Sequence, residues 1–131
     1  VQKEAAQRIC AEVGSRQSGA VTVSINYYAK PEMLFPVSAG SFMPAPKVDS
    51  AVIRLNVLSE PPVKVNDEKK FFSVVKASFA QRRKVISNSL SSGLSLSKEK
   101  TAEILEKAGI PLNARAEKFS LQDFADIANN L

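Results

Sequence analysis

The residues of this chain that could take part in chemistry are mostly basic. Between positions 69 and 84 the sequence has six basic residues and no acidic one, whereas the other positions balance 12 basic against 13 acidic residues. The six are Lys69, Lys70, Lys76, Arg82, Arg83 and Lys84. Such a concentration of positive charge is typical of a surface that binds nucleic-acid phosphates. The alternative is a solvated helix face, because basic side chains are also favoured near the C-terminal end of a helix.

A second candidate is Phe42, which heads the proline-stiffened stretch Phe42-Met43-Pro44-Ala45-Pro46. A rigid, exposed aromatic ring could stack on a nucleobase, because every base offers a π-face. The alternative is structural, since prolines simply stiffen a loop before an edge strand and a lone phenylalanine is more often part of a core.

Composition argues against several other kinds of site. The 131 residues include no histidine, the commonest general base, and one cysteine, which excludes an internal disulfide and argues against a zinc site. We interpret that residue, Cys10, as a small buried hydrophobe rather than a reactive thiol. No carboxylate pair, nucleophile–base pair or glycine-rich phosphate loop stands out, and no apolar run approaches the roughly 18 residues that span a bilayer. The net charge of +5 is compatible with an anionic partner.

The first part of the chain is predicted to mix helix and strand. Residues 2–13 place their apolar side chains at helical spacing. Residues 21–28 alternate apolar and polar side chains, which predicts a strand with its two adjacent tyrosines on opposite faces. The short apolar run at 33–37 contains a proline and is expected at a sheet edge. A further strand is predicted over residues 51–57.

The second part is predicted to be helical. Residues 59–62, Ser-Glu-Pro-Pro, form a linker and the best internal boundary. Beyond it, Asn66 or Asp67 is expected to cap a helix that continues through the basic residues towards Leu90 and stops near Gly93.

Two later helices carry clear end signals. Ser97 is expected to cap one of them, which Gly109 and the following Pro111 terminate. Ser120 and Asp123 resemble a capping box at the start of the last helix.

Several motifs occur in the order found in one protein family. They are Val1-Gln2-Lys3-Glu4, Tyr27-Tyr28, Phe42 to Ser50, Phe79-Ala80-Gln81-Arg82-Arg83-Lys84, Asn88-Ser89-Leu90, Gly109-Ile110, Arg115-Ala116-Glu117 and Ser120 to Leu131. Together they closely resemble the bacterial 16S ribosomal RNA adenine dimethyltransferases, which are related to the erythromycin-resistance methylases. Ala45 departs from the pattern, because the family commonly has a third proline there.

The resemblance does not include the motifs with which this family binds its cofactor. The glycine-rich S-adenosylmethionine loop, the acidic ribose ligand and an Asn-Leu-Pro-Tyr type catalytic motif would all precede the position that matches Val1. We therefore expect the C-terminal half of such an enzyme, an α+β fragment. Residues 1–59 would hold the last helix and the antiparallel strands of a Rossmann-like methyltransferase sheet, and residues 60–131 a small all-α, RNA-binding C-terminal domain.

The resemblance also implies an activity for the full-length enzyme. S-adenosylmethionine would donate methyl groups to N6 of two adjacent adenines near the 3′ end of 16S ribosomal RNA during small-subunit maturation. Phe42 matches an aromatic residue that stacks on the extruded target adenine. The residues expected to contact RNA phosphates are Lys47, Lys76, Arg82, Arg83 and Lys84.

The expected partner is 16S ribosomal RNA in an immature small subunit, in the cytoplasm and away from membranes. The full-length enzyme is expected to be a monomer, whereas the fragment is expected to be able to self-associate through exposed strand edges. The fragment by itself is expected neither to bind S-adenosylmethionine nor to methylate. Two alternatives stand beside this interpretation: a non-enzymatic RNA-binding or ribosome-assembly module that uses the same surface, and a globular domain whose basic helix is fortuitous.

Overall fold

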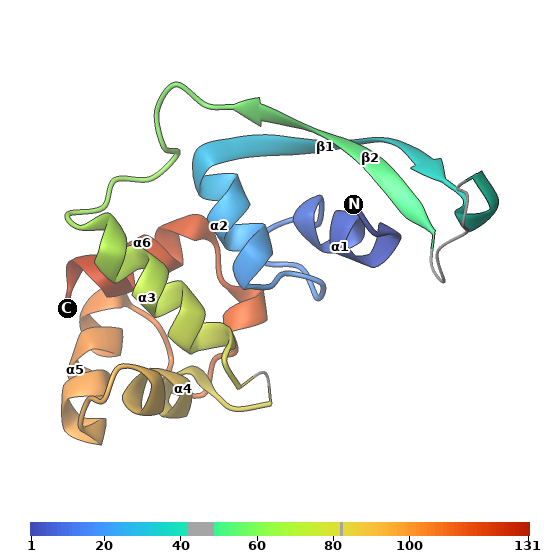
Figure 1. Ribbon diagram of the computed structural model, residues 1–131. Helices are drawn as coiled ribbons and strands as arrows, with labels where there is room; N and C mark the ends of the chain where they lie inside the picture. Colours follow the sequence, from blue (N-terminus) through green and yellow to red (C-terminus); the bar gives the residue numbers. More distant parts are fainter. Residues whose placement is uncertain (42–48, 82) are drawn as a thin grey trace.

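The chain folds into a group of helices and a long β-hairpin (Figure 1). The computed structural model describes residues 1–41, 49–81 and 83–131. In these residues the helices are α1 (Lys3–Ile9), α2 (Ala20–Tyr28), α3 (Glu68–Phe79), α4 (Ile86–Gly93), α5 (Lys98–Ala108) and α6 (Leu121–Asn129), with short 3-10 turns η1 (Ala39–Ser41) and η2 (Ala116–Lys118). The strands are β1 (Ala29–Val37) and β2 (Ser50–Val57), so the predicted α+β class is confirmed. None of the helices in the described ranges is both long and apolar enough to cross a membrane.

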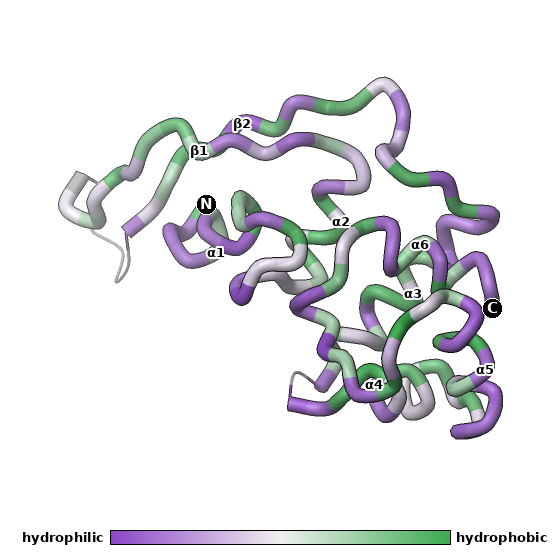
Figure 2. Tube along the Cα trace, turned by 180° about the vertical axis from the view of Figure 1, so that it is seen from behind, coloured by the Kyte–Doolittle hydropathy of each residue, from purple (hydrophilic) through white to green (hydrophobic). Residues whose placement is uncertain are grey.

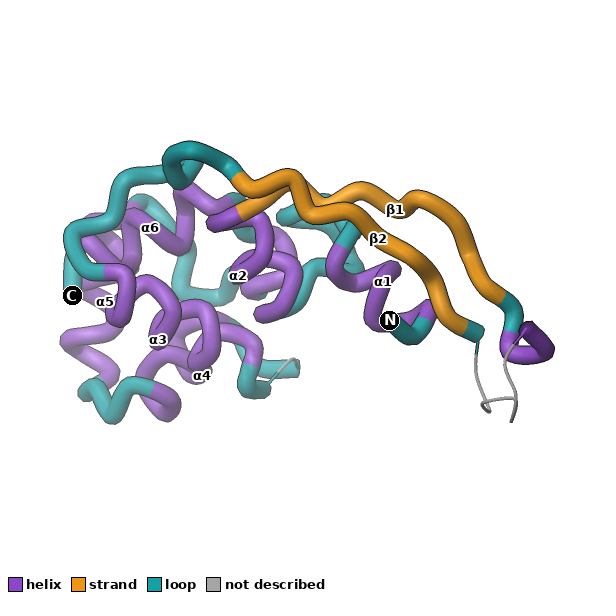
Figure 3. The backbone as a smooth tube through the Cα atoms, turned by 45° about the horizontal axis from the view of Figure 1, so that its top comes forward, coloured by secondary structure: helices purple, strands orange, loops and turns teal. Residues whose placement is uncertain are grey.

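The two strands form an antiparallel hairpin that extends past the helices on one side (Figure 3). Their register runs from the pair Ala29–Val57 to the pair Val37–Ser50. The strand predicted over residues 51–57 is therefore confirmed. The apolar run at 33–37 is the second half of β1, which begins earlier than the sequence indicated.

The first residues of the chain extend the sheet on the other side of β2. The amide of Ala51 donates a hydrogen bond to the carbonyl oxygen of Val1 at 2.7 Å, and the amide of Lys3 donates to the carbonyl oxygen of Asp49 at 2.9 Å. β2 thus has β1 along one edge and residues 1–3 along the other. Helix α1 follows directly and packs against the hairpin (Figure 1).

Residues 20–28 form helix α2, so the strand predicted over 21–28 is wrong. The alternation of apolar and polar side chains indicated a period of two. The buried residues of the segment are instead Thr22, Val23 and Tyr27, whose spacing places them on one face of a helix. Contact of this face with α3 therefore overrides the β-propensity of the segment.

The hydroxyl of Thr22 shows why a helix begins here. Its Oγ1 accepts a hydrogen bond from the amide of Gly19 at 3.1 Å and donates to the carbonyl oxygen of Arg8 at 2.6 Å. The first bond satisfies an amide that the start of a helix leaves without a partner. Gly19 is therefore the N-cap of α2.

The adjacent tyrosines of α2 have very different surroundings. Tyr27 is 2% exposed and Tyr28 is 50% exposed, so one of the pair is buried and the other is not, although both lie on a helix. The ring of Tyr27 packs 4.8 Å from that of Phe71, and its hydroxyl donates to Oε1 of Glu68 at 3.1 Å. Tyr27 therefore joins α2 to α3 through both an apolar and a polar contact.

The long helix predicted from Asp67 towards Gly93 is in fact two helices, α3 and α4. Asp67 caps α3 as predicted, because its carboxylate accepts a hydrogen bond from the amide of Lys69 at 2.9 Å. After α3 the chain turns, and α4 packs against α3. The two helices meet closely at Gly93, where an added Cβ would lie 2.6 Å from Cβ of Ala77. Packing of α4 onto α3 replaces the continuation of one helix.

The end signals of the last two long helices are confirmed. Oγ of Ser97 accepts a hydrogen bond from the amide of Lys100 at 3.1 Å, and Gly109 ends α5 with a left-handed φ of 73°. At the start of α6, the amide of Asp123 donates to Oγ of Ser120 at 3.2 Å, and the amide of Ser120 donates back to Oδ2 of Asp123 at 3.0 Å. Both caps use only local contacts, which is why the sequence predicts them.

One apolar core joins α2 to α3–α6 (Figure 2). Its largest fully buried side chains are Tyr27, Phe71, Phe124, Ile86, Leu90, Ile104, Leu105, Ile127, Val23, Val74 and Val75. The linker before α3 is fastened to the same unit, because Nδ2 of Asn129 donates to the carbonyl oxygen of Lys64 at 3.1 Å and Oδ1 accepts the amide of Asn66 at 2.8 Å. Helix α2 therefore packs as part of the helical unit, although it precedes the hairpin in the chain.

We expect Gly93→Ala to destabilise the fold. The added methyl group would overlap the side chain of Ala77, and overfilling a packed contact costs about 1–3 kcal/mol. Urea unfolding should show a free energy of unfolding lowered by about that amount. Gly40→Ala is the control, because the nearest atom to its added Cβ is Oγ of Ser38 at 3.9 Å. Equal losses in the two variants would contradict the packing argument.

The contact between Tyr27 and Glu68 should make stability depend on pH. Burial, then the hydrogen bond and negative charge of Glu68, raise the pKa of Tyr27 above its ordinary value of 10.0. The fold thus favours the neutral hydroxyl, so this stabilisation is complete below pH 10 and is lost as the pH rises through the raised pKa.

The free energy of unfolding of Tyr27→Phe should therefore fall less between about pH 8 and about pH 11 than that of the unmodified chain. Urea unfolding at both pH values measures the difference. Tyr28→Phe, which changes the chain's only other tyrosine, is the matched control and should follow the unmodified chain. An alkaline loss of the same size in the Tyr27→Phe variant would show that this hydroxyl does not contribute.

Candidate nucleic-acid interface

Arg83 and Lys84 lie exposed in the connection between α3 and α4. The connection is held at both ends, because the amide of Lys84 donates to the carbonyl oxygen of Gln81 at 3.0 Å and the amide of Ile86 donates to that of Ala114 at 2.7 Å. Among the described residues, neither cation forms an ion pair. Two positive charges are thus presented to solvent on a fixed turn, where they can receive an anion.

The remaining described cations of the basic segment lie on α3. Lys69 and Lys70 are exposed in its first turn, and Lys76 is exposed in its last. The prediction that all six cations share one helix is therefore wrong, because Arg83 and Lys84 follow α3 in a turn. The reason is the packing of α4 onto α3, which ends the helix before those residues.

Three of the predicted site residues, Phe42, Lys47 and Arg82, lie outside the residues that the structure describes. The described ends on either side of the first two are joined, because the amide of Ala39 donates to Oδ1 of Asp49 at 2.8 Å. The sequence interpretation included Asp49 in the motif Phe42 to Ser50 but gave it no individual role. The feature of the sequence that could have indicated this hydrogen bond is the residue type, because aspartates in loops commonly accept hydrogen bonds from backbone amides.

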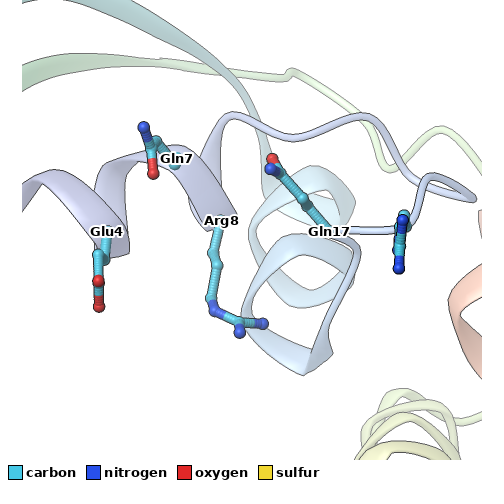
Figure 4. Close-up of a pocket in the computed structure, with 5 residues that line it drawn as sticks. Glu4, Gln7, Arg8 and Gln17 are labelled. Carbon is cyan, nitrogen blue, oxygen red and sulfur yellow. The ribbon is translucent and has the colours of Figure 1, made fainter.

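A polar hollow of about 550 Å³ lies beside α1 (Figure 4). The residues that line it are Glu4, Gln7, Arg8, Arg16 and Gln17. Glu4 and Arg8 project from the same side of α1, as residues four positions apart on a helix do. Sequence reasoning missed this hollow, because Arg16 and Gln17 belong to the α1–α2 loop, whose path is decided only by folding.

Cys10, the single cysteine of the chain, is partly buried directly after α1. Burial raises the pKa of its thiol, which keeps the thiol in its neutral, poorly nucleophilic form. The environment therefore favours packing over reactivity. Within residues 1–41, 49–81 and 83–131, no three His, Cys, Asp or Glu side chains gather where they could hold a metal ion.

The chain matches one known protein family along its whole length. All of residues 1–131 match the family described as ribosomal RNA adenine dimethylase. The chain belongs to this family. Members of this family methylate RNA. The exposed cations Arg83 and Lys84 therefore belong to a protein of an RNA-methylating family.

Similar curated proteins carry the name ribosomal RNA small subunit methyltransferase A. One from Caldanaerobacter subterraneus subsp. tengcongensis is 50% identical over 131 residues, which is 100% of this chain and 48% of that protein. Another from Geobacillus thermodenitrificans is 45% identical over 134 residues, with 100% and 46% covered. The chain thus spans about half the length of the curated relatives it matches.

Two solved structures are similar in fold. A dimethyladenosine transferase from Plasmodium falciparum matches with a TM-score of 0.75 and 20% identity, covering 96% of this chain and 53% of that one. The 23S rRNA methyltransferase ErmE matches with a TM-score of 0.60 and 24% identity, covering 99% and 52%. The hairpin and helices described above therefore form an arrangement that methyltransferases of this kind contain.

Proposed function

We propose that this chain is the C-terminal part of an S-adenosylmethionine-dependent enzyme that dimethylates N6 of two adjacent adenines near the 3′ end of 16S ribosomal RNA. The single observation that carries its role in RNA binding is the exposed pair Arg83–Lys84, held on a turn without ion-pair partners in the described residues. The family match over residues 1–131 and the names of the relatives support the reaction class. The partner would be the immature small ribosomal subunit in the cytoplasm.

The composition of the sheet supports assignment to the C-terminal part. In the described residues the sheet holds only β1, β2 and the edge contact of residues 1–3. Large apolar side chains of the hairpin are left exposed, among them Phe35 at 52% and Val57 at 81%. Exposed apolar surface of this extent is expected if the sheet continues in the rest of a longer enzyme. In this proposal residues 1–59 complete the catalytic domain, and residues 60–131 form the helical domain.

The proposed roles of the site residues follow from their chemistry. Phe42 would stack on the extruded adenine. The cations that would contact RNA phosphates are Lys47, Lys76, Arg82, Arg83 and Lys84. Contacts of this kind position an RNA without reading its sequence, so recognition by the helical domain would rest on the shape of the folded RNA.

The polar hollow beside α1 does not have the lining that S-adenosylmethionine needs. A site for an adenosyl cofactor needs apolar walls around the adenine ring with a few polar groups to orient it. The hollow beside α1 is instead lined only by charged and amide side chains. In this proposal the cofactor site therefore lies in the part of the enzyme outside this chain.

We accordingly expect isothermal titration calorimetry of the 131-residue chain with S-adenosylmethionine to show no binding heat. The physical reason is that the hollow beside α1 offers charged and amide side chains, and no apolar walls for the adenine ring. Saturable binding by this chain would contradict the assignment of the cofactor site to the rest of the enzyme.

For RNA binding, we expect the triple variant Arg82→Ala, Arg83→Ala, Lys84→Ala to weaken the affinity of the chain for a labelled RNA stem-loop. Each phosphate contact adds about 0.9 to the slope of log K against log salt concentration, so loss of two or three contacts should lower that slope by about 2–3. Fluorescence anisotropy at several salt concentrations measures both quantities.

The control for this experiment is Lys69→Ala, Lys70→Ala, at the opposite end of α3. This helix has 12 residues and is about 18 Å long. The control should change affinity and slope much less. If binding responds neither to salt nor to the triple substitution, the proposed RNA-binding role of the α3–α4 turn is wrong.

A second candidate function is a non-enzymatic RNA-binding or ribosome-assembly module. It is favoured by the same observation, because the exposed cations do not depend on a cofactor site. The reading frame upstream of Val1 discriminates between the two. A glycine-rich motif followed by an Asn-Leu-Pro-Tyr type motif there would support the enzyme, and their absence would support the module.

A further inference from the structure

Two other segments of the chain carry exposed cations and are connected to the Arg83–Lys84 turn through a series of backbone contacts. One is the α1–α2 loop, residues 10–19, and the other is the segment 112–118 that leads through η2. In sequence these three segments are separated by tens of residues, and in the fold the segment around η2 lies between the α1–α2 loop and the α3–α4 turn (Figure 1).

The segment 112–118 is joined to the start of α4 by its backbone. The amide of Ile86 donates to the carbonyl oxygen of Ala114 at 2.7 Å, and the amide of Ser87 donates to that of Leu112 at 3.3 Å. Arg115 directly follows Ala114, and Lys84 lies two residues before Ile86. These bonds therefore keep Arg115 close to the Arg83–Lys84 turn.

The α1–α2 loop lies against η2 at the other end of this segment. A Cβ built on Gly14 would lie 3.5 Å from the carbonyl oxygen of Lys118 and 3.6 Å from that of Phe119, and Gly14 has a left-handed φ of 89°. Glycine is thus suited both to the backbone conformation and to the close approach. Arg16 follows Gly14 by two residues, so the loop places the backbone of Arg16 near the end of η2.

The loop is also braced internally. The amide of Ser15 donates to the carbonyl oxygen of Glu12 at 3.1 Å, and the amide of Ser18 donates to that of Ser15 at 3.0 Å. The hydrogen bond from Thr22 to the carbonyl oxygen of Arg8 ties the end of α1 to the start of α2. Arg16 is therefore carried on an ordered loop, at the edge of the polar hollow beside α1.

The cations of these segments lack ion-pair partners in the described part of the chain. Those that are exposed are Arg16, Arg83, Lys84, Arg115 and Lys118. The acidic residues nearest to them in the sequence or in the hollow are Glu4, Glu12 and Glu117, which leaves an excess of positive charge. A group of like charges held together without partners repels itself, and an external anion relieves that repulsion.

We propose that Arg16 and Lys118, linked through Arg115 to Arg83 and Lys84, form a single track for the phosphate backbone of folded RNA. The proposal rests on the RNA partner proposed above and adds a second anchoring region to it. A run of fixed cations matches a polyanion, because each one can pair with a phosphate along the same strand or across a groove. The guanidinium groups of the three arginines can each hold two phosphate oxygens at once.

The test uses the 131-residue chain and a labelled RNA stem-loop, with affinity measured by anisotropy at several salt concentrations. Arg16→Ala, Lys118→Ala should lower the slope of log K against log salt by up to about 2, as expected for the loss of two phosphate contacts. The conservative swap Arg16→Lys, Lys118→Arg keeps both charges and should keep the slope. Circular dichroism verifies that each variant is folded.

Lys69→Ala, Lys70→Ala again serves as the control, because it removes the same charge from the far end of α3. If Arg16→Ala, Lys118→Ala behaves like this control while the triple variant at positions 82–84 still weakens binding, the track is wrong and the proposed function survives. If the triple variant also behaves like the control, the RNA-binding role itself fails, and the track fails with it.

Discussion

The hydroxyl of Thr22 is completely buried and makes two hydrogen bonds, one from the amide of Gly19 and one to the carbonyl oxygen of Arg8. Through these bonds the end of α1, the α1–α2 loop and the start of α2 form one rigid unit. Because α1 packs on the hairpin and α2 packs on α3, this unit determines the orientation of the hairpin relative to the helical core. A buried hydroxyl left without its partners would cost about 1–3 kcal/mol, so the arrangement is strongly favoured.

The helical core depends on a second constraint, the close approach of α3 and α4 at Gly93 and Ala77. This contact requires the chain to turn after α3. The turn moves Arg83 and Lys84 off the helix and onto a connection held by the carbonyl oxygen of Ala114. The same packing that buries apolar side chains thus exposes the charges on which the proposed RNA contact depends.

Much of the fold could be predicted from the sequence because its signals are local. The caps at Asp67, Ser97 and Ser120 and the left-handed end at Gly109 involve side chains and amides within a few residues of each other. The alternating strand over residues 51–57 was likewise predicted correctly. The similar alternation over residues 21–28 was misleading, because β-propensity expresses a fit to a sheet surface, and here the available neighbour was a helix.

For the candidate site, the sequence by itself determined the local features: a basic stretch around position 83 and the motifs that indicated the family, to which the match over residues 1–131 assigns the chain. Only the tertiary structure decided which other charges join that stretch. Arg16 and Lys118 are separated by about a hundred residues, and no periodicity links them. The two segments that carry them meet because a glycine at position 14 lets the backbone of the α1–α2 loop pass against η2. The sequence gives the type of every side chain directly, whereas the proximity of charges that are distant in the sequence results from tertiary packing.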